Sequence, residues 1–133
     1  MIIKNINEYF TDIYFYLHPS QQEIISHQSV RILQLIQKQQ HVTIQDVAQH
    51  LHISHNTASE HVKKLEKSKW VQKERSQEDQ RKVYLSLTVD GWIMLRANTE
   101  LDERKLTNAL AKLSEEDQQK VLEGFRLLSE VVK

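Results

Sequence analysis

The 133-residue sequence has no cysteine, one proline and two glycines, and aromatic residues make up only 7% of it. Without cysteine the chain has no disulfide framework and no thiol with which to sense oxidants. Because proline and glycine interrupt helices, their scarcity predicts a mostly helical fold. No apolar run is long enough to span a bilayer, and the residues after Met1 lack the pattern of a signal peptide. The sequence therefore predicts one cytoplasmic domain, residues 1–133, without a membrane segment.

Residues 42–68 have the apolar spacing of two short helices joined by a tight turn. The first predicted helix, 44–51, has one apolar stripe with helical period, formed by Ile44, Val47, Ala48 and Leu51. The second, 55–68, has inward positions of the same period at Ala58, Val62 and Leu65. Thr43 and Ser54 directly precede these helices. We expect both to be N-caps, because a hydroxyl there accepts a hydrogen bond from an unpaired amide of the first turn.

The face of the second helix opposite its apolar stripe is polar. It carries amide, carboxylate and ammonium groups from Asn56, Glu60, Lys63, Lys64 and Lys67. A helix that packs on one side and offers such groups on the other is suited to reading base edges in the major groove of DNA. The second helix is therefore a predicted recognition helix.

Residues 70–75 and 82–87 follow as two predicted strands around a polar tip. In the second strand, three apolar residues alternate with Lys82, Tyr84 and Ser86, which is the two-residue period of a half-buried strand. The tip, with the sequence SQEDQ, consists of polar turn formers. This pattern predicts a β-hairpin, and together with the two helices it predicts a winged helix-turn-helix.

Short motifs in this stretch resemble the MarR-type (multiple-antibiotic-resistance) repressors. These motifs are Asp79-x-Arg81 followed after five residues by Leu87-Thr88-x-x-Gly91, Leu65-Glu66 near the end of the recognition helix, and Trp70-Val71 at the start of the hairpin. The resemblance covers residues 30–91 by motif and the flanking helices by arrangement. It implies a mostly α-helical chain with a small β-hairpin wing, whose winged helix-turn-helix core is flanked by N- and C-terminal dimerisation helices.

The resemblance also implies a function. Proteins of this type are homodimeric, sequence-specific transcriptional regulators, more often repressors, which bind an inverted repeat in double-stranded DNA. A small-molecule effector can release them by changing the distance between two recognition helices that must match about 34 Å, one turn of B-DNA. No cofactor is expected.

The resemblance further assigns roles to individual residues. In the family the wing arginine enters the minor groove and is held by the aspartate two residues before it, so Arg81 and Asp79 are expected in these roles. A narrow minor groove concentrates negative potential, which suits an arginine. The residues expected to read bases are Asn56, Thr57, Ser59, Glu60 and Lys63, and those expected to contact phosphates are Ser54, His55, Lys64 and Lys67.

Two residues depart from the family pattern. Lys69 stands where the family usually has a glycine that leaves the recognition helix, so it must adopt a left-handed conformation at some cost or end the helix differently. Glu60 stands where many relatives carry a neutral or basic residue. A carboxylate can accept a hydrogen bond from cytosine, but it also repels phosphate. The operator sequence cannot therefore be transferred from relatives.

Basic and acidic side chains are equal in number, 18 of each, which gives a formal net charge of +0. An isolated DNA-binding domain is usually more basic. Residues 41–88 contain eight basic and six acidic side chains, whereas the residues after Thr88 contain seven basic and nine acidic ones. The positive balance of the predicted DNA-binding region is modest, so we expect tight binding to need two copies of the chain.

Apolar stripes also mark both ends of the chain. A helix is expected before Pro19, another over residues 27–39 with Val30, Leu33, Leu35 and Ile36 facing inward, and one long helix from Thr88 toward Leu113. Ser114 and the acidic residues after it predict the start of a last helix. We assign residues 27–91 to the winged helix-turn-helix and residues 1–26 and 92–133 to dimerisation helices.

The stripes on the terminal helices are expected to be buried between two copies rather than only against each other. The reason is that a lone recognition helix contacts few base pairs, and this architecture usually doubles it. The residues expected in this interface are Ile6, Phe10, Ile13, Leu17, Val121, Leu122, Phe125, Leu128 and Val132.

Seven histidines raise the alternative of a metal-responsive regulator, because imidazole is a common zinc ligand. Five of them lie in the predicted DNA-binding region, at His41, His50, His52, His55 and His61. No pair lies four residues apart on a predicted helix, and zinc-sensing members of the family use histidines on the helix after the wing, where this chain has none. We therefore expect surface histidines near phosphates, and no metal site.

An enzyme is not expected, because the sequence lacks a glycine-rich phosphate loop, a metalloprotease motif and a nucleophile elbow. The remaining alternative is a winged-helix module that binds proteins and has lost DNA binding. Zero net charge and Glu60 favour it, whereas Asp79 with Arg81 and the lysines of the recognition helix favour DNA. Salt distinguishes the two, because binding through phosphates weakens steeply as salt rises.

Overall fold

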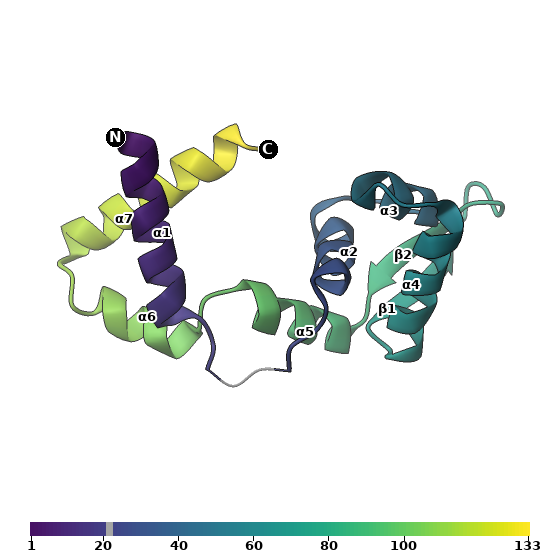
Figure 1. Ribbon diagram of the computed structural model, residues 1–133, viewed down its shortest axis with the longest axis horizontal. Coiled ribbons are helices and arrows are strands. Elements are labelled where there is room, and N and C mark those ends of the chain that lie inside the picture. Colours follow the sequence, from purple (N-terminus) through teal and green to yellow (C-terminus); the bar gives the residue numbers. More distant parts are fainter. Residues whose placement is uncertain (21–22) are drawn as a thin grey trace. The chain divides into compact units, whose positions relative to one another are not determined.

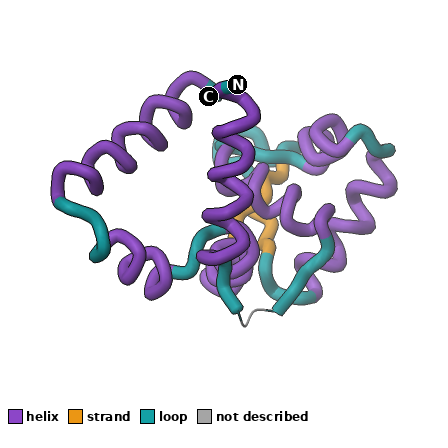
Figure 2. The backbone as a smooth tube through the Cα atoms, turned by 60° about the vertical axis from the view of Figure 1, so that its left-hand side comes forward, coloured by secondary structure: helices purple, strands orange, loops and turns teal. Residues whose placement is uncertain are grey.

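The computed structural model describes residues 1–20 and 23–133, and within them it contains seven α-helices and one antiparallel hairpin (Figures 1 and 2). The predicted mostly α-helical winged fold is confirmed. In chain order the elements are α1 (Ile2–Leu17), α2 (His27–Lys38), α3 (Ile44–Leu51), α4 (His55–Lys67), β1 (Val71–Arg75), β2 (Val83–Leu87), α5 (Val89–Thr99), α6 (Glu103–Leu110) and α7 (Glu115–Val131).

The chain forms two compact units. One consists of Ser20–Glu100 and is called the core unit below; the other consists of Met1–Pro19 with Leu101–Lys133 and is called the terminal unit. The core unit therefore contains α2 to β2 and also α5, which the sequence had assigned to the dimerisation helices from residue 92 onward.

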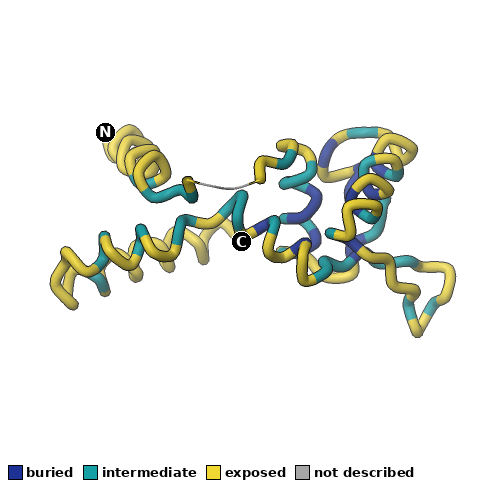
Figure 3. The backbone as a smooth tube through the Cα atoms, turned by 90° about the horizontal axis from the view of Figure 1, so that it is seen from below, coloured by how far each residue is buried: buried dark blue, intermediate teal, exposed yellow. Residues whose placement is uncertain are grey.

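All 13 buried hydrophobic side chains of the described residues lie in the core unit, and Figure 3 shows the buried backbone segments gathered there. Twelve of them come from α2, α3, α4, both strands and α5, and the other, Val42, lies between α2 and α3. In α2 the buried residues are Ile32, Leu33 and Ile36, whereas Val30 and Leu35 are only half-buried. The prediction was right at Leu33 and Ile36, and Leu35 packs against the core, but it missed Ile32, which lies one turn before Ile36 and shares its face.

Hydroxyl caps begin α3, α4 and α5, and those at Thr43 and Ser54 are as the sequence predicted. Thr43 accepts a hydrogen bond from the Asp46 amide, and the Asp46 carboxylate accepts one from the Thr43 amide, which completes a capping box at 3.2 and 2.9 Å. Ser54 and Thr88 likewise accept from the third residue of α4 and α5. These bonds pair amides that the first helical turn cannot pair.

The long helix expected from Thr88 toward Leu113 is wrong, because the structure divides it into α5 and α6. Glu100 has an extended backbone, with φ −96° and ψ 159°, and ends α5. Asp102 then caps α6, because its carboxylate accepts a hydrogen bond from the Lys105 amide at 2.9 Å. A new cap of this kind competes with helix continuation, since it pairs first-turn amides that an unbroken helix would pair with its own carbonyls.

Lys69, which stands where the family usually has a glycine, adopts the left-handed conformation, with φ 65°. The Trp70 amide donates to the Leu65 carbonyl at 3.0 Å, and the Lys69 amide donates to the Glu66 carbonyl at 2.9 Å. These two bonds are a Schellman motif, which ends α4 and turns the chain into β1. The turn after α3 has the same form, with His52 at φ 56°.

The hairpin pairs Val71 with Leu87 at one end and Arg75 with Val83 at the other. A further bridge joins Val42, the residue before the α3 cap, to Leu85, whose amide donates to the Val42 carbonyl at 2.7 Å. Val71 and Leu85 are buried, while Val83 and Leu87 are half-buried. The base of the wing is therefore fixed to the core, and its tip extends away from it.

The terminal unit is built differently. None of the residues of α1, α6 and α7, all of which the structure describes, is buried. The end of α1 is tied to the start of α6 by the Asp102 amide, which donates to the Leu17 carbonyl at 2.8 Å, and by Lys105 Nζ, which donates to the His18 carbonyl at 3.0 Å. Across the described residues, no helix has the length and apolarity that a membrane crossing needs.

Candidate nucleic-acid interface

Helix α4 packs through its apolar stripe and leaves its other face to solvent. Ala58, Val62 and Leu65 are buried as predicted. The predicted contact residues of α4 and its cap that are exposed are Ser54, His55, Asn56, Thr57, Glu60, Lys63, Lys64 and Lys67. Ser59 is half-buried, so it is the least accessible of the predicted base readers. The structure thus brings the predicted set together on one exposed surface.

The start of α4 is ordered by two hydroxyl groups. Ser54 Oγ accepts from the Thr57 amide at 3.1 Å and donates to Thr57 Oγ1 at 2.9 Å. The dipole of the helix places partial positive charge at this end, beside His55 and Asn56, which favours a phosphate there. Ser54 therefore acts first as the cap that shapes the anion-attracting end of α4.

Acidic residues of α4 are paired with lysines. Glu60 lies 3.7 Å from Lys63 Nζ, with both side chains largely exposed, so the pair contributes little to stability. It does lower the negative charge that Glu60 presents to a phosphate. Glu66 lies 3.2 Å from Lys73 Nζ, and this pair joins α4 to β1.

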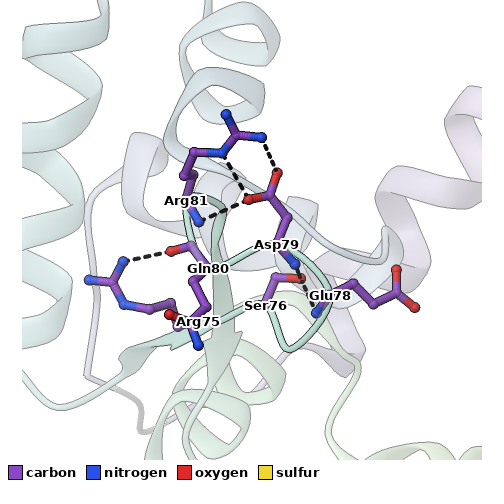
Figure 4. A network of polar contacts seen from close by, with 6 residues as sticks. All are labelled: Arg75, Ser76, Glu78, Asp79, Gln80 and Arg81. Atoms are coloured by element: carbon purple, nitrogen blue, oxygen red, sulfur yellow. Dashed lines mark hydrogen bonds and ion pairs between the residues drawn. The ribbon is translucent and has the colours of Figure 1, made fainter.

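The wing tip holds the predicted pair Asp79 and Arg81 in direct contact (Figure 4). Asp79 Oδ1 accepts from the Arg81 amide and from Arg81 Nε, both at 3.1 Å, and Oδ2 accepts from Nη2 at 3.4 Å. The Arg81 side chain is nevertheless 91% exposed, against 30% for Asp79. The carboxylate therefore holds the Arg81 amide and one edge of the guanidinium, Nε and Nη2, while most of the side chain stays open to solvent.

This contact changes the acidity of Asp79. The side-chain hydrogen bond from Arg81 lowers the pKa of the Asp79 carboxyl below its ordinary value, and the Arg81 amide and the charge of Lys82 act in the same direction. Partial burial opposes them. Asp79 thus stays ionised, and able to hold Arg81, at more acidic pH than an isolated aspartate would.

Two further residues of the wing were missed from the sequence. Arg75 Nη1 donates to the Gln80 carbonyl at 2.7 Å, and Ser76 Oγ accepts from the amides of Glu78 and Asp79, both at 3.2 Å (Figure 4). The spacing Ser76-x-x-Asp79 is a signal that could have revealed the serine, because serine hydroxyls often accept from amides two or three residues on. No sequence spacing predicts the role of Arg75, because its partner, the Gln80 carbonyl, is a backbone group.

Among residues 1–20 and 23–133, no three side chains of the metal-binding types come close enough to share an ion. The histidines have other neighbours. The His41 ring meets the Tyr84 ring edge to face, with centroids 4.7 Å apart, and His18 Nδ1 lies 2.8 Å from the Tyr14 carbonyl. His52 ends α3 in its left-handed conformation.

The terminal unit offers a second surface, an apolar groove between α1 and α7. It has a volume of about 850 Å³, and its walls include Ile6, Phe10, Ile13, Val121, Phe125 and Leu128. These six belong to the predicted dimer interface. Of the other predicted interface residues, Leu122 and Val132 are 61% and 74% exposed, and Leu17 is half-buried. The predicted stripes are thus left uncovered in a single chain.

The comparisons with known proteins agree with this fold. The family model described as "MarR family" matches residues 25–83. YfiV of Bacillus subtilis (strain 168), an HTH-type transcriptional regulator, is 30% identical over 104 residues, which are 78% of this chain and 65% of YfiV. The chain therefore spans just under two thirds of the length of this relative.

Solved structures show the same fold at lower identity. MepR of S. aureus bound to ethidium bromide is 19% identical and superposes with a TM-score of 0.63 over 99% of this chain and 94% of its own. A mutant of MepR bound to an oligodeoxyribonucleotide is 21% identical, with a TM-score of 0.55 over 82% and 80%. The stretch that carries the winged helix-turn-helix, residues 25–83, thus matches the MarR family model, and the chain is similar in sequence to an HTH-type transcriptional regulator and in fold to MepR.

Proposed function

We propose that this chain is a homodimeric, sequence-specific DNA-binding protein that represses transcription from an inverted-repeat operator. The observation that carries the proposal is the pairing of an exposed polar face on α4 with a wing arginine that is 91% exposed and held by Asp79. Helix α4 would enter the major groove and Arg81 the adjacent minor groove. A similar fold in S. aureus, a mutant of MepR, is bound to an oligodeoxyribonucleotide, which supports this class of partner.

The terminal unit supports the dimer. Its helices bury no side chain within one chain, although α1 and α7 carry large apolar residues that are about half exposed or more, such as Phe10 at 59% and Phe125 at 54%. Exposed apolar surface on this scale is unusual for a monomer and marks an interaction site. A second copy presents the same apolar stripes, so a twofold-symmetric pair covers both.

A dimer also compensates for the weak charge of one copy. Two α4 helices about 34 Å apart read successive major grooves on one face of DNA. Repression follows physically, because a dimer that occupies both half-sites excludes other proteins from the same DNA. The cytoplasm is the compartment in which we expect this activity.

Regulation by a small molecule would act on the spacing of the two α4 helices. The apolar groove of the terminal unit, with its aromatic wall residues Tyr9, Phe10 and Phe125, is the surface on which an apolar effector would alter the pairing of copies. MepR of S. aureus, which has a similar fold, is bound to ethidium bromide in its structure, and this supports an aromatic compound as the first to test.

The test is selection from a random duplex library with the purified protein at two salt concentrations, repeated with Arg81→Ala. Arg104→Ala is the matched control, since Arg104 is an exposed arginine of α6 outside the proposed interface. We expect the selected duplexes to contain an inverted repeat and the protein to bind it less tightly at high salt. Arg81→Ala should lower the affinity about tenfold or more, and Arg104→Ala should leave it unchanged. If Arg81→Ala and Arg104→Ala bind equally well, the wing assignment is wrong.

Phe125→Glu tests the dimer by sedimentation velocity, because a carboxylate in an apolar interface is costly to bury. We expect monomers. A Phe125→Glu variant that still sediments as a dimer would contradict the terminal-unit interface. Recovery of no duplex at either salt would favour the protein-binding alternative.

A further inference from the structure

The wing tip is also braced by hydrogen bonds other than those between Asp79 and Arg81. Ser76 is the residue that leaves β1, and its amide donates to the Lys82 carbonyl at 2.9 Å, which closes the loop. Within that loop the Ser76 hydroxyl accepts from the Asp79 amide at 3.2 Å. The backbone that carries the Asp79 carboxylate is therefore held by a side chain at the start of the loop (Figure 4).

The other end of the Asp79–Arg81 pair is held by Arg75. Its Nη1 donates to the Gln80 carbonyl at 2.7 Å, and that carbonyl belongs to the peptide bond whose nitrogen is the Arg81 amide. A charged donor makes this bond stronger than one between neutral groups. The peptide plane before Arg81 is thus fixed from one side by Arg75, while the Arg81 amide on the other side is fixed by Asp79 Oδ1.

We propose that Ser76 and Arg75 are positioning residues for the wing arginine, and that they act on DNA affinity through Arg81 rather than by contacts of their own. This inference rests on the proposed function. Its physical reason is preorganisation: a loop already held in its bound conformation loses less conformational freedom on binding. Without the brace, the seven loop residues 76–82, all exposed or half-buried, have to become ordered on the DNA.

The rival role for Arg75 is a direct phosphate contact, since it is an exposed cation on β1. The two roles differ in a double-mutant cycle. A residue that acts only through Arg81 has no further effect once Arg81 is alanine. A residue that binds phosphate still contributes to affinity when Arg81 is alanine. Its substitution reduces the number of counterions released on DNA binding by about one, which lowers the slope of affinity against salt concentration.

The experiment measures the affinity of the dimer for the selected operator in the variants Ser76→Ala and Arg75→Gln, each alone and combined with Arg81→Ala. Ser76→Thr keeps the accepting hydroxyl and is the rescue variant. Ser86→Ala is the matched control, because Ser86 Oγ lies on β2 and donates to Glu74 at 3.4 Å, away from the tip.

We expect Ser76→Ala and Arg75→Gln each to weaken binding about 3- to 10-fold, the usual range for one hydrogen bond, and to have no effect when Arg81 is alanine. Ser76→Thr and Ser86→Ala should bind as the unaltered protein does. Additive losses in the double variants, or no loss in the single ones, would overturn the proposal while leaving the wing function of Arg81 intact.

A measurement on the free protein covers the case in which no operator is recovered. The side-chain Nε–H signal of Arg81 in a nitrogen-15 NMR spectrum reports its hydrogen bond to Asp79, without DNA. We expect Ser76→Ala and Arg75→Gln to move this signal toward that of a solvated arginine, and Ser86→Ala to leave it in place. An unmoved signal in both wing variants would show that the brace does not position Arg81.

Discussion

Among the residues that the structure describes, three other than glycine adopt left-handed backbone conformations, namely His41, His52 and Lys69 with φ between 56° and 65°. For residues with a Cβ atom this region costs of order 1–2 kcal/mol. Two of them follow α3 and α4, where Schellman hydrogen bonds require the conformation. The chain has only two glycines and uses neither at these positions. The local strain is a cost that the packing of the helix-turn-helix overcomes.

Lys69→Gly should therefore raise the free energy of unfolding by about 1 kcal/mol, because glycine adopts positive φ without steric penalty. The hydrogen bond from Thr88 Oγ1 to the Lys69 carbonyl, at 2.6 Å, uses the backbone and survives the change. Urea denaturation at fixed protein concentration measures the effect. Ser68→Gly is the control, since Ser68 has φ −74° and should gain nothing. A less stable Lys69→Gly protein would show that the lysine side chain has a stabilising role.

Asp79 gives a prediction for pH. Its pKa in the folded chain is lowered, first by the Arg81 side chain, so the contact contributes stability above the unfolded-state pKa and loses it as pH falls through the folded-state pKa. Arg81→Ala should raise the pKa of Asp79 toward the ordinary value, and Lys82→Ala should raise it less, because Lys82 acts only through its charge. Carboxyl NMR titration measures both. An unchanged midpoint in Arg81→Ala would mean that the ion pair does not form in solution.

At the scale of elements, the junction of α4, β1 and α5 brings two backbone segments into close contact. Thr88 accepts from the Gly91 amide at 2.9 Å, and its own amide donates to the Trp70 carbonyl at 3.1 Å. A Cβ atom on Gly91 would lie 2.0 Å from the Trp70 carbonyl oxygen. Glycine is needed here for close approach of two backbones, which explains the motif Leu87-Thr88-x-x-Gly91 in physical terms.

Gly91→Ala should accordingly lower the free energy of unfolding by about 3 kcal/mol or more, because the clash is with backbone that cannot move alone. Gly124→Ala is the matched control on α7, where nothing lies within 4 Å of the added carbon in one chain. It should cause no comparable loss, since alanine favours a helix. Thermal unfolding measures the stability of both variants. Similar stabilities would contradict the close approach of Gly91 to the Trp70 carbonyl.

The elements also show which sequence patterns are reliable. The bounds of α3 were predicted as observed, and those of α2 and α4 to within one residue, because apolar period and capping hydroxyls agree there. The single long helix after Thr88 was wrong because apolar residues on both sides of Glu100 keep a helical period. Asp102 is compatible with a helix interior and with a cap, and the hydrogen bond from the Lys105 amide to its carboxylate shows that it is a cap.

At the scale of the whole molecule, stability is unevenly divided. All buried hydrophobic side chains of the described residues belong to the core unit, whereas the helices of the terminal unit bury none. Burial of apolar surface is the dominant favourable term in folding. The core unit therefore has the means to fold alone, and the terminal unit needs a partner surface.

A fragment of residues 20–100 should then unfold cooperatively and independently of protein concentration. The full chain should show a melting temperature that rises with concentration, because association stabilises the terminal helices by mass action. Phe125→Glu should remove that dependence and leave the unfolding of the core unit in place. Circular dichroism at concentrations spanning two decades tests all three proteins. A full chain whose melting is independent of concentration would contradict the dimer as the source of stability.

The sequence alone was sufficient for the helices and hairpin of the winged helix-turn-helix and for the caps at Thr43 and Ser54, because each depends on residues close together in the chain. The pairing of Asp79 with Arg81 was expected from the resemblance to the MarR-type repressors. Only the tertiary structure decided the break between α5 and α6, the burial of Ile32 in α2, and the brace on the wing from Arg75. These depend on backbone groups or distant residues, which carry no signal in the identity of a side chain.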